Sequence, residues 1–322
     1  PGTTEHFCPE RFCVSCAYSL RILAMQQAIF RNEEFSAAGA TITEDISPAN
    51  LIVGVKQISA NKLLHNKNYL FFAHVIKAQR DNMPLLDEIL HEMFGEYLVY
   101  ATTQDIMLMQ LFDYECITQG AQAGGPRLVA FGKFAGIAGM IDTLQGLGQR
   151  LLVEGINSPF LNIGNAYTME SLEYVRLFYF GEILLNPQTC RHAKTAIRRA
   201  GERISKEGLP IPLVFAFTGS GNVSQGAQEI FELLPHEYVN VSDLPALRQQ
   251  LQDGTRPRNK LYAVVVNAGD MVVHTAGDAF KSAHYYAHPE EYSPVFHTNV
   301  APFINVIVNG MYWDPRFPRL LT

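Results

Sequence analysis

Short apolar runs alternate along the chain with stretches that have the apolar spacing of a helix. Runs of strand length occupy residues 51–55 (LIVGV), 69–73 (YLFFA), 128–131 (LVAF), 213–217, 237–241, 261–266 and 305–309. Helical spacing marks residues 18–30, 84–90, 135–147 and 193–206. Strands that alternate with helices predict parallel sheets with helices on their faces. The expected fold is therefore α/β, with two Rossmann-like parallel-sheet domains and an interdomain cleft.

The length of 322 residues fits two domains. The pattern restarts after Arg191, and the glycine-rich helix at residues 135–147 has the spacing that allows close packing on a neighbour. We therefore expect one domain over residues 1–131 and another over residues 132–322.

One strand is followed by a glycine turn of the kind that seats a nucleotide. Residues 212–231 (PLVFAFTGSGNVSQGAQEIF) indicate a strand, a turn and a helix that begins near Ser224. Gly219 and Gly221 allow the backbone to approach a pyrophosphate, and the N–H groups of the helix point at it. Because four residues separate Gly221 from Gly226, this is not the plain G-x-G-x-x-G motif, and an ordinary strand-to-helix turn is the alternative.

Composition and charge exclude several classes of function. A net charge of −6 and a pI near 5.9 argue against nucleic acid as the main partner. No apolar run reaches about 18 residues, so no membrane span is expected. The odd count of five cysteines favours reduced thiols. Cys13 and Cys16 form a C-x-x-C pair without a second pair at zinc spacing, so no metal site is expected.

Three ionisable residues follow predicted strands, and their side chains would meet at one sheet edge if these strands lie side by side and parallel. Lys56 follows the 51–55 run, His74 follows the 69–73 run, and Glu115 ends the LFDYE stretch. Ligands of open parallel sheets bind at that edge. A lysine and a histidine there suit proton transfer on an amine or carbonyl substrate, with Glu115 balancing their charge. If each residue is considered alone, Lys56 could be an ordinary solvated lysine and His74 an ordinary core histidine.

Weaker candidates lie near this edge. Lys77 and Gln79 are close enough in the chain to reach it, and Arg127 is suited to a carboxylate. His91 opens a zincin-like pattern, but Gly95 stands where the second histidine belongs. A serine nucleophile elbow is also absent from the sequence.

Several of these stretches resemble the lysine–ketoglutarate reductase portion of the alpha-aminoadipic semialdehyde synthase family. The chain is more distantly similar to lysine-forming saccharopine dehydrogenase and alanine dehydrogenase. The matching stretches are residues 38–57, 68–90, 127–152, 214–239 and 300–322.

The resemblance implies that L-lysine and 2-oxoglutarate condense and that NADPH reduces the imine to saccharopine. It implies Lys56 and His74 as the catalytic pair, with Glu115 tuning their charge. His74 would be the acid–base for imine formation, and Lys56 would manage the proton of the substrate amine. The substrate-binding candidates are Lys77, Gln79 and Arg127.

The resemblance also implies a role for each domain. Residues 1–131 would form the substrate domain, which is similar to the amino-terminal domain of alanine dehydrogenase. Residues 132–322 would form the Rossmann-like domain that binds NADP(H). The expected cofactor residues are Gly219, Ser220, Gly221, Asn222, Val223, Gly226 and Asn240. A NAD site usually has an acid about 20 residues past the glycine turn. The neutral Asn240 stands in that region and would tolerate a 2′-phosphate, with Arg258 as a distant candidate partner.

The chain also departs from the family. Residues 1–31 lack the family's arginine-bearing motif, so Arg11 is not carried over and the first domain is expected to be incomplete. Residues 94–110 and 169–188 resemble insertions, and we hypothesise that they are retained non-coding sequence.

The family continues beyond the last residue, normally into a glutamate-forming saccharopine dehydrogenase. The chain is therefore expected to be a fragment of a bifunctional enzyme. We expect the mitochondrial matrix as its compartment if the enzyme is of the animal type, and the cytoplasm otherwise. Two alternatives stay open: an inactive NADP-binding remnant and an alanine-dehydrogenase-like enzyme. A homo-oligomer is also compatible with the sequence.

Overall fold

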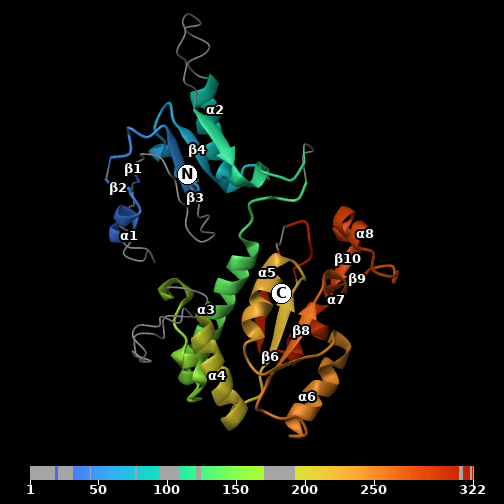
Figure 1. The fold of residues 1–322 in the computed structure, drawn as a ribbon. Helices are drawn as coiled ribbons and strands as arrows, with labels where there is room; N and C mark the ends of the chain where they lie inside the picture. The colour runs from blue at the N-terminus through green and yellow to red at the C-terminus, as the bar shows by residue number, and fades with distance from the viewer. Residues whose placement is uncertain are drawn as a thin grey trace, which may run out of the picture. The chain divides into compact units, whose positions relative to one another are not determined.

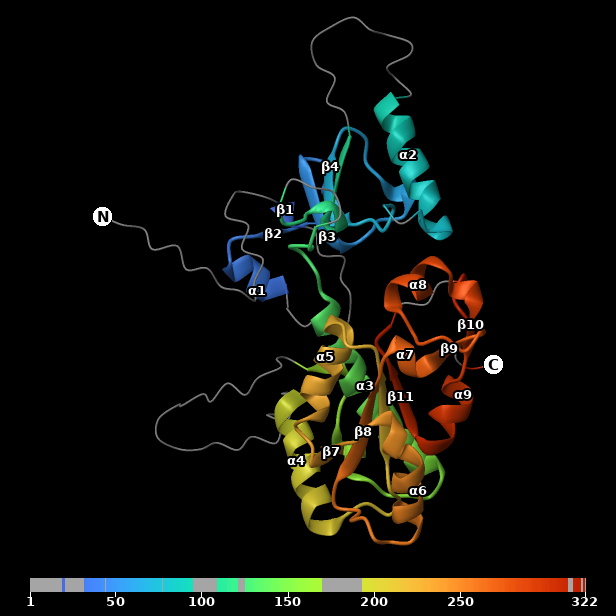
Figure 2. The same ribbon diagram turned by 90° about the vertical axis from the view of Figure 1, so that its right-hand side faces the viewer.

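The structure is a computed structural model, drawn in Figures 1 and 2. It describes residues 19–20, 32–43, 45–76, 78–94, 109–120, 125–169, 193–311, 315–319 and 321. The chain divides into two compact units, Pro1–Ala130 and Phe131–Thr322. This boundary lies one residue before the expected one, and the roles expected for the two domains stay predictions.

The first unit contains a parallel sheet of three strands in the order β3-β4-β5. The strands are β3 (Leu51–Lys56), β4 (Asn68–Phe72) and β5 (Gln110–Asp113). Helix α2 (Met83–Phe94) packs on one face, where Leu85 and Ile89 meet Tyr69 and Phe71. The edge strand β3 is exposed at Leu51, Val53 and Val55, whereas Ile52 packs partly buried against this core.

The predicted strand at 128–131 is wrong. Leu128 is 64% exposed, and Phe131 instead caps the following helix. Thr118 and Arg127 form an antiparallel bridge, and Leu128 N donates to Ile117 O, so this stretch folds back on residues 117–119. The third strand of the sheet is β5, from the LFDY stretch.

A smaller pair of strands precedes this sheet. β1 (Ser19–Leu20) runs parallel to β2 (Thr41–Ile42), and α1 (Asn32–Ala37) lies between them in the chain. The helix predicted at 18–30 is contradicted at Ser19–Leu20, and its other residues lie outside the described ones.

The second unit contains a parallel four-stranded sheet in the order β11-β6-β8-β7. The strands are β6 (Val214–Thr218), β7 (His236–Tyr238), β8 (Leu261–Val266) and β11 (Val306–Asn309). The predicted strands are all present, and β8 matches its prediction residue for residue. The α/β fold with parallel sheets is confirmed. Because β8 lies between β6 and β7, the second strand along the chain does not pair with the first.

Alternate residues of β6 supply the two cores of this unit. Phe215 and Phe217 face α3 (Gly132–Val153), α4 (Ala193–Glu207) and α5 (Asn222–Phe231). Val214 and Ala216 face α6 (Leu244–Gln252) on the other side. Figure 2 shows α4 and α5 on one side of the sheet and α6 on the other.

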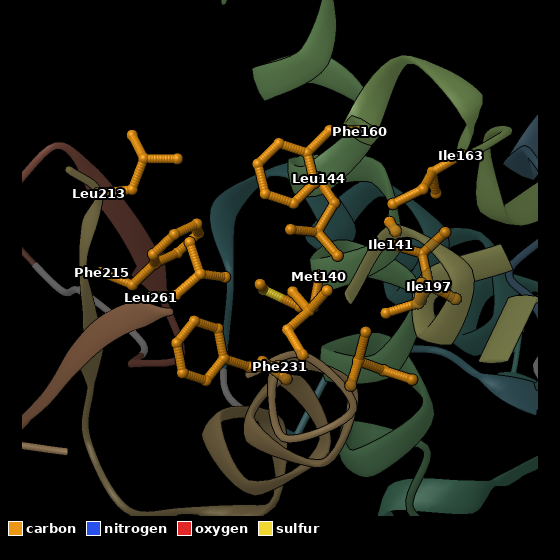
Figure 3. Packing of buried hydrophobic residues seen from close by; sticks show 14 of the residues in the cluster. Met140, Ile141, Leu144, Phe160, Ile163, Ile197, Leu213, Phe215, Phe231 and Leu261 are labelled. Atoms are coloured by element: carbon orange, nitrogen blue, oxygen red, sulfur yellow. The ribbon is translucent and has the colours of Figure 1, made fainter. Parts of the chain in front are cut away.

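Side chains of the first core point toward one another in Figure 3. They include Met140, Ile141, Leu144, Phe160, Ile163, Ile197, Leu213, Phe215, Phe231 and Leu261.

Two glycines let α3 and α5 approach to backbone contact. A Cβ on Gly136 would overlap Val223 O, and a Cβ on Gly226 would overlap Lys133 O. A Cβ on Gly148 would likewise come within 2.7 Å of Leu161 N. The close packing expected from the glycines of this helix is therefore confirmed at Gly136 and Gly148.

Further elements follow β8. They are α7 (Ala268–Met271), β9 (Val272–His274), α8 (Ser282–Ala287), β10 (Tyr292–Pro294) and α9 (Phe296–Asn299), with β9 and β10 antiparallel. Single turns of 3₁₀ helix occur at Ala60–Lys62, Arg80–Asn82, Tyr114–Cys116, Pro159–Asn162, Ala166–Thr168, Val241–Asp243, Pro289–Glu291 and Ala301–Phe303. Among the described residues, none of the helices has the length and apolarity needed to cross a membrane. The expected insertions at 94–110 and 169–188 lie almost wholly outside the described residues.

Candidate active site

The carboxyl edge of the first sheet brings His74, Glu115 and Arg127 together. Nδ1 of His74 lies 3.3 Å from Oε2 of Glu115, and a guanidinium nitrogen of Arg127 lies 2.7 Å from Oε1. The Glu115 side chain is 1% exposed, whereas His74 and Arg127 are 34% and 37% exposed. One buried carboxylate thus joins two groups that both reach solvent. Such a carboxylate orients the imidazole of His74.

Asp113, which sequence reasoning missed, ties two strand ends together. Its Oδ1 accepts hydrogen bonds from Ala73 N at 3.2 Å and Glu115 N at 2.9 Å. The first bond crosses from β5 to the residue after β4, and the second caps the turn that carries Glu115. His74 and Glu115 are therefore placed by the same side chain. The only sequence signal was a carboxylate two residues before Glu115, a common turn pattern.

His74 also has a strained backbone. Its φ is +56°, in the left-handed region that costs a non-glycine residue energy. Asn82 supports this turn: its Nδ2 donates to Gln79 Oε1 at 3.1 Å and to His74 O at 3.5 Å. Gln57 Nε2 in turn donates to Asn82 Oδ1 at 2.7 Å. Gln79, predicted to bind substrate, is here part of the network that holds the His74 turn.

Lys56 is the last residue of β3, at the same edge of the sheet as His74. Its side chain is exposed and makes no ion pair with any residue that the structure describes. The amino group of Lys56 is thus accessible to a ligand. Lys77, the remaining substrate-binding candidate, lies outside the described residues.

Cys116 is an exposed free thiol next to Glu115. Exclusion of water by the surrounding protein raises the pKa of Cys116, and Asp113 and Glu115 raise it further. Arg127 acts in the opposite direction.

In the second unit, the glycine turn after β6 has the geometry of a phosphate cradle. Gly219 has a φ of +76°, and Gly221 is the residue that precedes α5. A Cβ on Gly219 would come within 2.6 Å of Met311 Cγ, so only glycine fits there. Thr218 Oγ1 donates to Asn309 Oδ1 at 2.6 Å and accepts from Gly310 N at 3.0 Å, which joins the ends of β6 and β11.

A cavity of about 1160 Å³ opens at this carboxyl edge. Its walls come from the segments after β6, β8 and β11, from α8, and from the C-terminal residues. Of the predicted cofactor residues, Gly219, Ser220 and Gly221 line the cavity. Asn222, Val223 and Gly226 do not, because they lie in α5, where Val223 and Gly226 contact α3.

Asn240 follows β7, and β8 separates that strand from β6. Its Nδ2 donates to Asp243 Oδ2 at 3.1 Å, and it does not line the cavity. The expectation that it meets the cofactor assumed that β7 lies beside β6. Arg258 donates to Pro210 O, at the opposite end of the sheet from the glycine turn.

Another cluster resembles a metal site in its composition. His274, His284 and Glu291 place one potential ligand atom each within 4.8 Å of one another. Ala276 N donates to His274 Nδ1 at 3.2 Å, so the proton of a neutral ring lies on Nε2. That nitrogen is 3.2 Å from Glu291 Oε2. The arrangement suits a histidine–carboxylate hydrogen bond, and we assign no metal to it.

Comparisons with known proteins give a consistent group of relatives. No family model matches the chain. It is 42% identical over 298 residues to alpha-aminoadipic semialdehyde synthase of Arabidopsis thaliana, which covers 89% of this chain and 25% of that protein. The chain is 36% identical to the mitochondrial alpha-aminoadipic semialdehyde synthase of Mus musculus and 37% identical to that of Bos taurus. Each of these alignments spans 308 residues, which is 95% of this chain and 29% of the relative.

Among solved structures, an L-alanine dehydrogenase matches with a TM-score of 0.31 and 13% identity, over 81% of this chain and 52% of that chain. The resemblance expected from the sequence is confirmed by the semialdehyde synthases. The chain spans only about a quarter of their length, and the mammalian relatives are named mitochondrial.

Proposed function

We propose that this chain is the lysine–ketoglutarate reductase part of a bifunctional alpha-aminoadipic semialdehyde synthase. The observation that carries the proposal is the cluster of His74, Glu115 and Arg127 beside Lys56 at one sheet edge. It occurs in a chain 36–42% identical to these synthases over most of its length. The reaction joins L-lysine and 2-oxoglutarate and yields saccharopine.

The residues of the first sheet suit the proton transfers of this reaction. Attack of the lysine ε-amine on the ketone carbon gives a carbinolamine, and loss of water gives the imine. His74 donates the proton that the departing hydroxyl needs, and Glu115 orients its imidazole. Lys56 receives the proton that the substrate amine must lose. Arg127 compensates the charge of Glu115 and offers a guanidinium for a substrate carboxylate.

The second unit fits a dinucleotide. The space beside Gly221 is open, because a Cβ there would meet no atom within 4 Å. The N–H groups at the start of α5 suit a pyrophosphate in that space. A nicotinamide cofactor supplies the hydride that reduces the imine carbon. We propose NADPH as that cofactor and the mitochondrial matrix as the compartment. A glutamate-forming saccharopine dehydrogenase is the proposed fused partner.

The test follows NADPH absorbance with the purified chain, L-lysine and 2-oxoglutarate. Oxidation that needs both substrates and disappears in Lys56→Met supports the proposal. Lys62→Met is the matched control, since Lys62 is exposed in the same unit, outside the cluster.

Oxidation with ammonia in place of lysine would indicate an alanine-dehydrogenase-like enzyme. NADPH binding to a folded chain without oxidation would indicate an inactive remnant, and either result refutes the reductase.

A further inference from the structure

An extra residue in β3 sets the direction of the Lys56 side chain. Val53 pairs with Leu70, but the next pair along the two strands joins Lys56 to Phe72. Three steps along β3 thus match two steps along β4, which is the pattern of a β-bulge. A bulge redirects the side chains that follow it. Lys56 therefore lies level with Phe72, whereas a regular strand would place Val55 there.

The bulge turns Lys56 to the face of the sheet on which His74 lies. Tyr69 and Phe71 belong to the core that packs on α2, so Phe72 points to the other face. The His74 ring stacks on the Phe72 ring, with centres 6.0 Å apart and planes 18° apart. Lys56 points the same way as its pairing partner Phe72. The two proposed catalytic residues thus share the face opposite α2.

The residue after Lys56 is tied to the turn that carries His74. Gln57 Nε2 donates to Asn82 Oδ1 at 2.7 Å. Asn82 Nδ2 donates to Gln79 Oε1 at 3.1 Å and to His74 O at 3.5 Å. Asn82 is 9% exposed, so these bonds lie away from bulk water, where hydrogen bonds are stronger. One buried amide therefore connects the neighbour of Lys56 with His74 itself.

The contacts of Asn82 suit a role in placing other residues. It ends the 3₁₀ turn Arg80–Asn82 that leads into α2, and both its amide oxygen and its amide nitrogen bond to protein groups. His74 needs such support, because a backbone φ of +56° persists in a non-glycine residue only where the surroundings fix it. A change at Asn82 should therefore displace Lys56 and His74 relative to each other.

We propose that Asn82 is a positioning residue that sets the spacing of Lys56 and His74 through Gln57 and the His74 turn. This inference rests on the proposed function and adds to it a residue that acts without touching substrate. Proton transfer requires groups held within hydrogen-bond reach of the reacting atoms, and a displacement of about 1 Å can cost roughly a hundredfold in rate.

Steady-state kinetics test the inference by separating kcat from KM. The variants are Asn82→Asp, Asn82→Ala and Gln57→Met. The carboxylate of Asn82→Asp can still accept from Gln57, but it places an acceptor against His74 O. Asn61→Asp is the matched control, because Asn61 is an exposed asparagine of the same unit.

Both Asn82 variants should lower kcat roughly ten- to hundredfold, with the KM for NADPH within about twofold of the wild-type value. Gln57→Met should also lower kcat, with little change in melting temperature. It removes one hydrogen bond together with Gln57 Oε1, which is buried and has no hydrogen-bond partner among the residues that the structure describes. Adding Gln57→Met to Asn82→Ala should slow turnover no further, since that bond is already lost. Asn61→Asp should keep wild-type kinetics.

The ring signal of His74 reports the same link without turnover. It is identified in a proton–carbon correlation spectrum of the histidine-labelled chain by its loss in His74→Gln. Gln57→Met acts on the neighbouring strand, so it should shift this signal through Asn82. In the Asn82→Ala background, the same substitution should leave the signal where it is. Melting temperatures of all variants check that they fold.

Two results would overturn the inference. One is a wild-type kcat in a folded Asn82 variant, and the other is an unchanged His74 signal in Gln57→Met. If the Asn82 variants do not fold, Gln57→Met decides through its kcat and its His74 signal. Failure of the proposed function is a different result, since it appears as missing lysine-dependent oxidation in the wild type.

Discussion

The substitution Gly136→Ala tests the close contact between α3 and α5 in the second unit. The added methyl group would overlap Val223 O, so α3 and α5 would have to separate. Gly139 lies in the same helix, but a Cβ there meets nothing within 4 Å. Gly139→Ala therefore changes the same residue type in the same helix without the collision.

The difference between the two variants isolates the collision. Alanine gains about 0.5–1 kcal/mol over glycine in a helix interior at either position. Overpacking typically costs about 1–3 kcal/mol, and here the obstructing atom is backbone, which yields less than a side chain. We expect Gly136→Ala to be less stable than Gly139→Ala by at least about 1–3 kcal/mol. For a domain of this size, that corresponds to roughly 2–12 °C in melting temperature.

Urea and thermal denaturation, followed by far-ultraviolet circular dichroism, measure both variants beside the wild type. Gly139→Ala should melt at or above the wild-type temperature, and Gly136→Ala below it. If Gly136→Ala were as stable as Gly139→Ala, the backbone contact between α3 and α5 would be refuted.

Three further substitutions have defined outcomes. Thr218→Val removes both hydrogen bonds between β6 and β11 and should destabilise the unit by about 1–3 kcal/mol in urea denaturation. Lys260 lowers the pKa of Glu237 from 4.5, so the charged form stabilises the fold above that pH and the contribution disappears as the pH falls through the lowered value. The melting-temperature difference between Glu237→Gln and wild type should therefore shrink as the pH falls below 4.5; a constant difference would contradict this. Glu115→Gln should cost about 1–2 kcal/mol of stability in urea denaturation, since it leaves Arg127, itself over one-third exposed, without its carboxylate.

Sequence periodicity predicted the regular parts of the fold because their apolar residues face packed neighbours. It located β8 residue for residue and β6 to within one residue. It failed at 128–131, where an apolar run serves as a turn and a helix cap. The short elements between β8 and β11 have no run long enough to show a period.

The residues of the candidate site were likewise predictable only in part. Strand-end reasoning identified Lys56, His74 and Glu115, because parallel strands bring their carboxyl ends to one edge. The supports of these residues were not predictable, since they are contacts between distant parts of the chain. Asn82 meets Gln57 across 25 residues, and Asp113 meets Ala73 across 40. The order of β7 and β8, which separates Asn240 from the glycine turn, was equally hidden.

The carboxylates around His74 also affect the reactivity of a neighbouring thiol. Cys116 is exposed, yet its raised pKa keeps it protonated at neutral pH. Because the thiolate is the form that attacks peroxides and alkylating agents, this cysteine should react slowly in spite of its accessibility. Burial of the thiol, with the carboxylates of Asp113 and Glu115, thereby protects this sulfur from oxidation.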